Sequence, residues 1–181
     1  MKFRAKDTAS VTMNATDVNT EGFRIGGIFN FECRDAEDNL LWTEEVHNLV
    51  TNVGLDNVLD VYLHATAATA TWYVGLKGAG AVVAGDTLAS HSNWTEFTDY
   101  TGDRQAYVEG AASGQSIDNS GSPAAFPITD TGTVAGAFLA SVATTTSGVL
   151  FAAVDFSASR SVTSGDTINV TYTISCADDG V

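Results

Sequence analysis

The sequence predicts an all-β protein: an antiparallel β-sandwich, jelly-roll-like, with one short α-helix at about residues 52–64. Three observations predict this class. Only 17% of the residues are charged, against a typical ~25%, and Thr, Ser and Asn supply much of the polar surface, as is common on pleated sheets. Short apolar runs recur between clusters of turn-forming residues. In TINVTYTISC, residues 167–176, apolar and polar residues alternate, which is typical of a strand with one buried face.

The first predicted element is a β-hairpin over residues 23–47. The runs GFRIGGIFNFECR and LLWTEEVHN are rich in aliphatic and aromatic residues, and DAEDN between them consists largely of turn formers. DAEDN superficially resembles a calcium-binding loop. Because it lacks the glycine at position six and the distal glutamate of an EF-hand, we interpret it as a turn.

The helix is predicted from one amphipathic stretch that follows the hairpin. Its apolar residues are spaced at i, i+3, i+4, i+7 and i+8, and they are Leu55, Val58, Leu59, Tyr62 and Leu63. Thr51 or Asn52 can cap the first turn, because either side-chain oxygen can accept a hydrogen bond from a free backbone N–H. A lone helix cannot bury such a stripe, so we expect it to lie across a sheet or to close the open end of the sandwich.

The middle of the chain predicts short strands joined by long connections. TWYVGLKG and RQAYVEGA are strand-like, and the segment between them carries Trp94, Phe97 and Tyr100 at every third position. This spacing suits neither a strand nor a long helix, so we expect an irregular loop held by aromatic anchors. The next loop, GQSIDNSGSPAAFPI, contains Pro123 and Pro127 and is expected at an edge or corner of a sheet.

The last third predicts three strands separated by turn signals: GTVAGAFLAS, GVLFAAVDFSA and GDTINVTYTISC. GVLFAAVDF is apolar on both faces, as expected for a central strand. Strands of this length and spacing favour a sandwich of roughly eight strands.

Length and charge restrict the domain organisation and the partners. The 181 residues suit one sizeable core, which we place at residues 21–181 after an extended N-terminal arm at residues 1–20. The formal charge is −14, from 22 acidic and 8 basic residues, so binding to nucleic acid or to an anionic membrane surface is not expected. We also expect no membrane span and no secretion signal, since no apolar run is long enough.

The basic residues are concentrated in the N-terminal arm. Lys2, Arg4 and Lys6 are three of the eight and lie within the first six positions. The arm is either an ordinary solvated chain end or a cationic segment that docks on an acidic partner or a neighbouring copy of the chain. In the second case the expected interface residues are Lys2, Phe3, Arg4 and Lys6.

The sequence predicts no catalytic residue, no metal ligand and no cofactor. Nucleophile-elbow, phosphate-loop, dinucleotide and zinc-protease motifs are missing, and His47, His64 and His91 are scattered without metal-ligand spacing. Cys33 and Cys176 lie in separate strand-like runs and are expected to be buried thiols rather than a disulfide. We interpret Arg104 as a structural anchor that pairs with Asp99, Asp103 or Glu96, or stacks on Tyr100.

Several phrases, in this order, resemble a group of small virion proteins of tailed bacteriophages. They are NLVTNVGLDNVLDVYL, WYVGLKG, AGDTLASHSNWTEFTDYT, GQSIDNSGSPAAFPI, GTVAGAFLAS and SGDTINVTYTISCADDG, and the resemblance covers about residues 22–181. It implies a structural component of the particle, assembled in the cytoplasm of the bacterial host, and it implies no catalytic residues.

Two positions in a particle are compatible with this resemblance. The first is a capsid decoration (cement) protein that bridges capsid subunits, with the major capsid protein or another virion protein as partner and with self-association, taken to be trimeric from how capsid symmetry axes are used. The second is a tail or tail-fibre-associated adhesin for a bacterial surface receptor, which would favour exposed aromatic side chains such as Trp72 or Trp94. An enzyme on a β scaffold, such as a glycan hydrolase, is a third hypothesis that the missing motifs disfavour.

Overall fold

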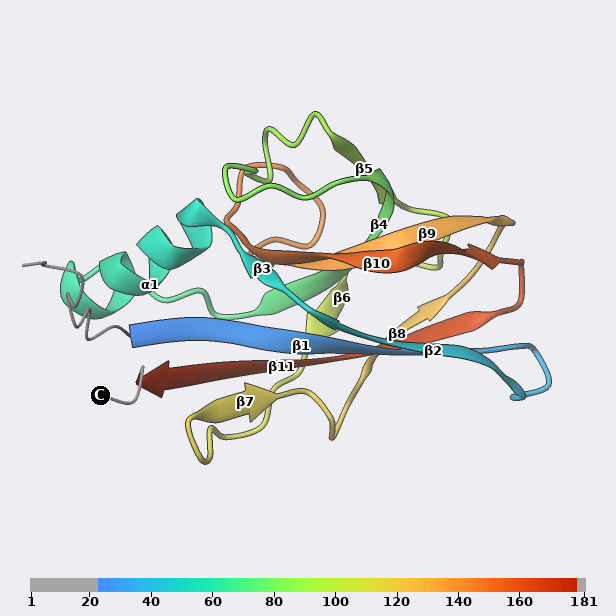
Figure 1. Ribbon diagram of the computed structural model, residues 1–181, viewed down its shortest axis with the longest axis horizontal. Helices are drawn as coiled ribbons and strands as arrows, with labels where there is room; N and C mark the ends of the chain where they lie inside the picture. The colour runs from blue at the N-terminus through green and yellow to red at the C-terminus, as the bar shows by residue number, and fades with distance from the viewer. Residues whose placement is uncertain (1–22, 179–181) are drawn as a thin grey trace, which may run out of the picture.

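The computed structural model describes residues 23–178, which form two antiparallel sheets and one short helix (Figure 1). The predicted all-β antiparallel sandwich with a single helix is confirmed. The N-terminal arm, with the predicted interface residues Lys2, Phe3, Arg4 and Lys6, lies outside the described residues.

The first sheet has the strand order β2-β1-β11-β7, and β8 also pairs with β11. Its strands are β1 (Phe23–Arg34), β2 (Leu40–His47), β7 (Ser116–Asp118), β8 (Ala124–Pro127) and β11 (Thr167–Asp178). β1 and β2 form the predicted hairpin, closed by the DAEDN turn, in which the Asp35 carboxylate accepts from the backbone N–H groups of Glu37 and Asn39. β1 pairs with β11 along its whole length, from Phe23 opposite Asp178 to Arg34 opposite Thr167 (Figure 1).

The second sheet has the strand order β3-β10-β9-β4-β5, and β6 also pairs with β4. Its strands are β3 (Leu49–Val50), β4 (Trp72–Gly80), β5 (Trp94–Phe97), β6 (Gln105–Tyr107), β9 (Gly132–Ala140) and β10 (Leu150–Val162). The chain crosses between the two sheets four times, from β2 to β3, from β6 to β7, from β8 to β9 and from β10 to β11. The three predicted strands of the last third are therefore confirmed, although they are divided between the two sheets.

The main core lies between the sheets and follows from strand alternation. Every second side chain of β1 and β11 points inward and is fully or nearly fully buried: Phe29, Phe31 and Cys33 from β1, and Ile168, Val170 and Tyr172 from β11. They meet inward side chains of the second sheet, including Val74, Leu76, Leu139 and Val154. The Tyr172 ring stacks on Phe29 with centroids 3.9 Å apart.

A smaller cluster covers the outer face of the second sheet. It contains Leu88, Trp94, Phe138, Ala140, Leu150 and Ala153. β10 is thus apolar on both faces, as predicted, because one face meets the main core and the other meets this cluster.

The prediction of an irregular loop between β4 and β6 was partly wrong. Trp94, Phe97 and Tyr100 are buried anchors, as expected, but Trp94–Phe97 forms strand β5 beside β4. The pairing shifts register between Lys77 and Gly80. Trp94 and Phe97 are both buried because residues three apart on a strand point to opposite faces, Trp94 to the smaller outer cluster and Phe97 to the main core. The proline-containing loop likewise holds two short strands, β7 and β8, and β8 ends at Pro127 on the sheet edge, where a missing N–H is tolerated.

The helix α1 (Asn52–Leu63) begins at a side-chain cap. Thr51 is the N-cap, and its hydroxyl oxygen accepts from the Gly54 N–H at 3.1 Å while the hydroxyl donates to the Leu150 carbonyl. Gly54 packs against β10 so closely that a β-carbon there would lie 2.2 Å from the Phe151 carbonyl oxygen. The first turn of α1 is therefore fixed to β10, at the end of the sandwich where β1 begins and β11 ends (Figure 1).

Replacing Thr51 with alanine is expected to lower the free energy of unfolding by about 1–2 kcal/mol, because a buried cap is lost and the Gly54 N–H is left without its partner. Urea unfolding followed by circular dichroism measures the loss. Thr51→Ser keeps the hydroxyl and should retain most of the stability. A Thr51→Ala protein as stable as the parent would show that the cap does not hold the helix.

Candidate functional site

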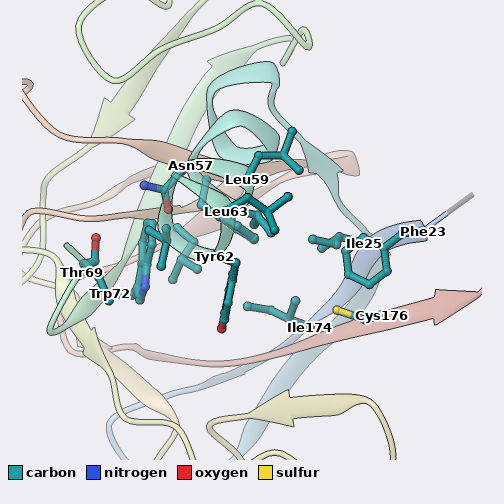
Figure 2. A pocket seen from close by; sticks show the side chains of 15 residues that line it. Phe23, Ile25, Asn57, Leu59, Tyr62, Leu63, Thr69, Trp72, Ile174 and Cys176 are labelled. Carbon is teal, nitrogen blue, oxygen red and sulfur yellow. The ribbon is translucent and has the colours of Figure 1, made fainter. Parts of the chain in front are cut away.

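An apolar groove of about 620 Å³ lies between α1 and the ends of β1 and β11. Figure 2 shows helix side chains, Leu59, Tyr62 and Leu63, facing the strand side chains of Phe23, Ile25, Ile174 and Cys176. The floor is formed by residues of the second sheet: Trp72, Leu139 and Phe151. The Trp72 ring meets the Phe151 ring edge-on, with centroids 5.4 Å apart. We call this feature the apolar groove.

The apolar groove corrects the prediction that the helix buries its stripe. Val58 packs against the main core, but Leu59 is 55% exposed, and Tyr62 and Leu63 are 80% and 81% exposed. Only the first turn of α1 is held tightly against the sandwich, through Gly54. The second half of the stripe borders the groove instead of filling the core.

The groove exists because β1 extends beyond its partner β2. β2 pairs with β1 only from Ile28 onward, and the chain then turns at Asn48, whose backbone N–H donates to the Gly27 carbonyl. The first residues of β1, Phe23–Gly26, are therefore paired with β11 on one side and have no strand neighbour among residues 23–178 on the other. α1 lies across this gap without closing it.

The lining of the groove is unsuited to catalysis. Its ionisable side chains are Tyr62 and Cys176, and the other lining residues are aliphatic, aromatic, Asn or Thr. Within residues 23–178 no three or more His, Cys, Asp or Glu side chains gather to hold a metal ion. No helix in this range is long and apolar enough to cross a membrane. The groove can bind apolar side chains from another segment, since burying their surface is favourable.

The two cysteines differ in accessibility. Cys33 lies in the main core with no exposed surface, and burial, assisted by the negative charge of Asp166, raises its pKa to about 12. Cys176 is half-buried in the groove. Both are free thiols, as predicted, but only Cys33 is fully buried.

In native protein we expect a thiol reagent such as dithionitrobenzoate to modify Cys176 much faster than Cys33. The reactive species is the thiolate, which burial disfavours at Cys33. The second equivalent should react rapidly only after unfolding in guanidinium. Equal reaction rates of both thiols in native protein would contradict this assignment.

Other residues singled out from the sequence have structural roles. Arg104 is buried and forms a bidentate salt bridge with Glu96, as predicted, with N–O distances of 2.9 and 2.8 Å. Its remaining N–H groups hold the backbone carbonyls of Val142 and Thr145, and the ring near its guanidinium is Phe138 rather than Tyr100. Arg104 thus ties β5 to the loop after β9.

The two tryptophans considered for receptor binding are both packed. Trp94 is 4% exposed, and its indole N–H donates to the Asp86 carboxylate at 2.9 Å. Trp72 is partly buried at the floor of the groove. His91 stacks on Trp94, with ring centroids 3.9 Å apart, and its Nδ1 lies 3.1 Å from the Trp94 carbonyl.

No protein-family model, characterised protein or solved structure matches this chain.

Proposed function

We propose that the protein is a non-enzymatic structural component of a tailed-phage particle, and specifically a capsid decoration protein that stabilises the head by bridging capsid subunits. The observation that carries the proposal is the apolar groove. The groove offers exposed apolar surface, and its ionisable side chains are Tyr62 and Cys176, which is the chemistry of protein–protein contact rather than of turnover.

The charge distribution supports contact through the N-terminal arm. Residues 23–178 contain five basic and 18 acidic side chains, which gives a formal charge of −13. Four of those five basic residues are held in ion pairs within the same range: Arg34, Lys77, Arg104 and Arg160. The cationic groups offered to an acidic partner are therefore mainly those of the arm, Lys2, Arg4 and Lys6, with Phe3 as an apolar anchor.

Copy number in purified particles tests the proposal most directly. Quantitative mass spectrometry against the major capsid protein should give hundreds of copies for a head decoration protein, whereas a tail component would give about three to twelve, set by the symmetry of the tail. A protein missing from purified particles would overturn both assignments. The same measurement therefore distinguishes the head decoration protein from the alternative, a tail-associated adhesin.

The role of the arm is tested with a charge-reversed protein, in which Lys2, Arg4 and Lys6 are all changed to glutamate. Binding to particles stripped of this protein should fall by at least about tenfold, and binding of the parent should weaken with rising salt, because the attraction is between solvent-exposed charges. Unchanged binding would reject the arm as the contact region. Arg24→Glu reverses the one basic residue of the described range that no ion pair holds, and it serves as the control for a charge reversal outside the arm.

A further inference from the structure

The apolar groove is bordered by large apolar side chains that stay exposed. Phe23 is 67% exposed, Tyr62 80% and Leu63 81%, and all three border the groove together with Leu59. With side chains of this size, the uncovered area is on the order of 500 Å², near the upper end of the largest apolar patches on soluble monomers. Apolar patches of this size on soluble proteins often bind a further segment or a partner.

The groove also borders a free strand edge. Phe23–Gly26 of β1 pairs with β11 but has no strand neighbour among the described residues on the side facing α1. An extended segment placed there would gain backbone hydrogen bonds from the edge and apolar contacts from the groove. The geometry thus favours an extended occupant with apolar residues at every second position.

The sequence immediately before β1 has this pattern. In SVTMNATDV, residues 10–18, the apolar residues Val11, Met13 and Ala15 alternate with Thr12, Asn14 and Thr16. Asn19 and Gly22, residues that favour turns, separate this run from Phe23. The first six positions add three positive charges, opposite in sign to the charge of residues 23–178.

We propose that residues 11–18 of the same molecule fold back over the apolar groove and seat their apolar side chains between α1 and β1. Phe23 itself lines the groove, and a chain spans ~3.3 Å per residue, so the segment reaches its site without strain. A tethered segment has an effective concentration on the order of millimolar. At micromolar protein it therefore outcompetes the same segment of another copy.

Cys176 provides a built-in reporter, since it lies in the groove while Cys33 is buried in the core. Single cysteines are introduced into the full chain as Val11→Cys, Met13→Cys and Ala15→Cys, with Thr12→Cys and Asn14→Cys as controls. On mild oxidation with diamide, at least one of the first three should form an intramolecular disulfide with Cys176 about tenfold faster than either control, because neighbouring side chains of an extended segment point to opposite faces.

The outcomes of the cross-linking experiment are distinct. Equal rates at all five positions would overturn the proposal. Disulfide-linked dimers at micromolar protein, seen on non-reducing gels, would also overturn it and would assign the groove to a second copy. The test uses no phage particle, so its result does not depend on the function proposed above.

Hydrogen exchange of the full-length protein gives a second measurement. Backbone amides of residues 11–18 should exchange about tenfold more slowly than in an isolated peptide of the same sequence. The protection should disappear in Leu63→Ser and persist in Leu55→Ser. Leu63 is an exposed groove residue, whereas Leu55 is an exposed leucine of the same helix outside the groove. Absence of protection in the parent protein, or equal protection in both variants, would contradict the proposal.

Discussion

Replacing Asp155 with alanine is expected to lower the free energy of unfolding by about 3 kcal/mol, because it leaves a buried ammonium without its counter-charge. Lys77 has no exposed side-chain surface, and its Nζ lies 2.7 Å from the Asp155 carboxylate. The Lys77 ammonium also donates to the carbonyls of Gly78 and Gly80, and its contact with Asp155 Oδ1 is an ion pair without hydrogen-bond geometry. The other carboxylate oxygen accepts from the Val82 N–H at 2.9 Å.

The strand between the two partners explains how this pair forms. Lys77 on β4 and Asp155 on β10 both lie opposite Gly136 on β9. Since Gly136 has no side chain, the lysine and the aspartate meet across it. Asp155 is 38% exposed, so water reaches the carboxylate and the expected loss stays at the lower end of that for fully buried pairs.

Two variants separate the effect of the pair from the general effect of mutation. Lys77→Met removes the buried charge and keeps most of the volume, so its cost should be only about 1 kcal/mol. Arg34→Ala breaks the part-exposed pair with Glu32 and should cost less than about 1 kcal/mol. Guanidinium unfolding of the three variants ranks them by their loss of unfolding free energy. An Asp155→Ala protein no less stable than Lys77→Met would show that the ammonium does not need its partner.

Replacing Gly54 with alanine is expected to destabilise the protein by about 1–3 kcal/mol, although alanine favours a helix over glycine by about 1 kcal/mol. The added methyl group would lie 2.2 Å from the Phe151 carbonyl oxygen and 2.9 Å from its carbon, both part of the backbone of β10. A strand inside a sheet cannot move aside as a flexible side chain can. The helix must shift instead, which also changes the groove because Phe151 and Trp72 form its floor.

Asp56→Ala on the same helix is the matched control. Asp56 is exposed, so its replacement should change stability by no more than about 0.5 kcal/mol. Chemical unfolding measures both variants, and Trp fluorescence reports the surroundings of the groove. A stabilised Gly54→Ala protein would mean that helix propensity prevails and that α1 is not tightly fixed to β10.

Local sequence patterns predicted those parts of the fold that depend on neighbouring residues, such as strand alternation and helix capping. Alternation in residues 167–176 predicted β11 and its inward side chains, and Thr51 capped the helix because hydroxyl oxygens satisfy free N–H groups. The phrase G-D-T-[LI] occurs twice, at residues 85–88 and 165–168; it is too short to indicate a repeat, yet it marks the same turn twice. Asp86 and Asp166 are both buried, and each accepts from the N–H three residues earlier.

The groove could not be predicted from the sequence, because it depends on how far each strand extends along its neighbour in the sheet. Helical spacing identified Leu59, Tyr62 and Leu63 as one face, but it did not indicate whether another element covers that face. The gap arises from the short β2 and the turn at Asn48, and this long-range arrangement leaves no local pattern. Likewise β5 was missed because both of its faces are covered, with Trp94 in the outer cluster and Phe97 in the main core, so its apolar residues do not follow the alternation of a half-buried strand.

The pairing of β1 with β11 joins the first and last described strands and therefore links folding to the order of synthesis. β1 leaves the ribosome early, but its neighbour on one side arrives only when residues 167–178 have been made. Until then one long edge of β1 stays open and exposed to other nascent chains. Rapid translation of the final strands would shorten that interval, so synonymous codons that slow this stretch should increase aggregation without changing the mature protein.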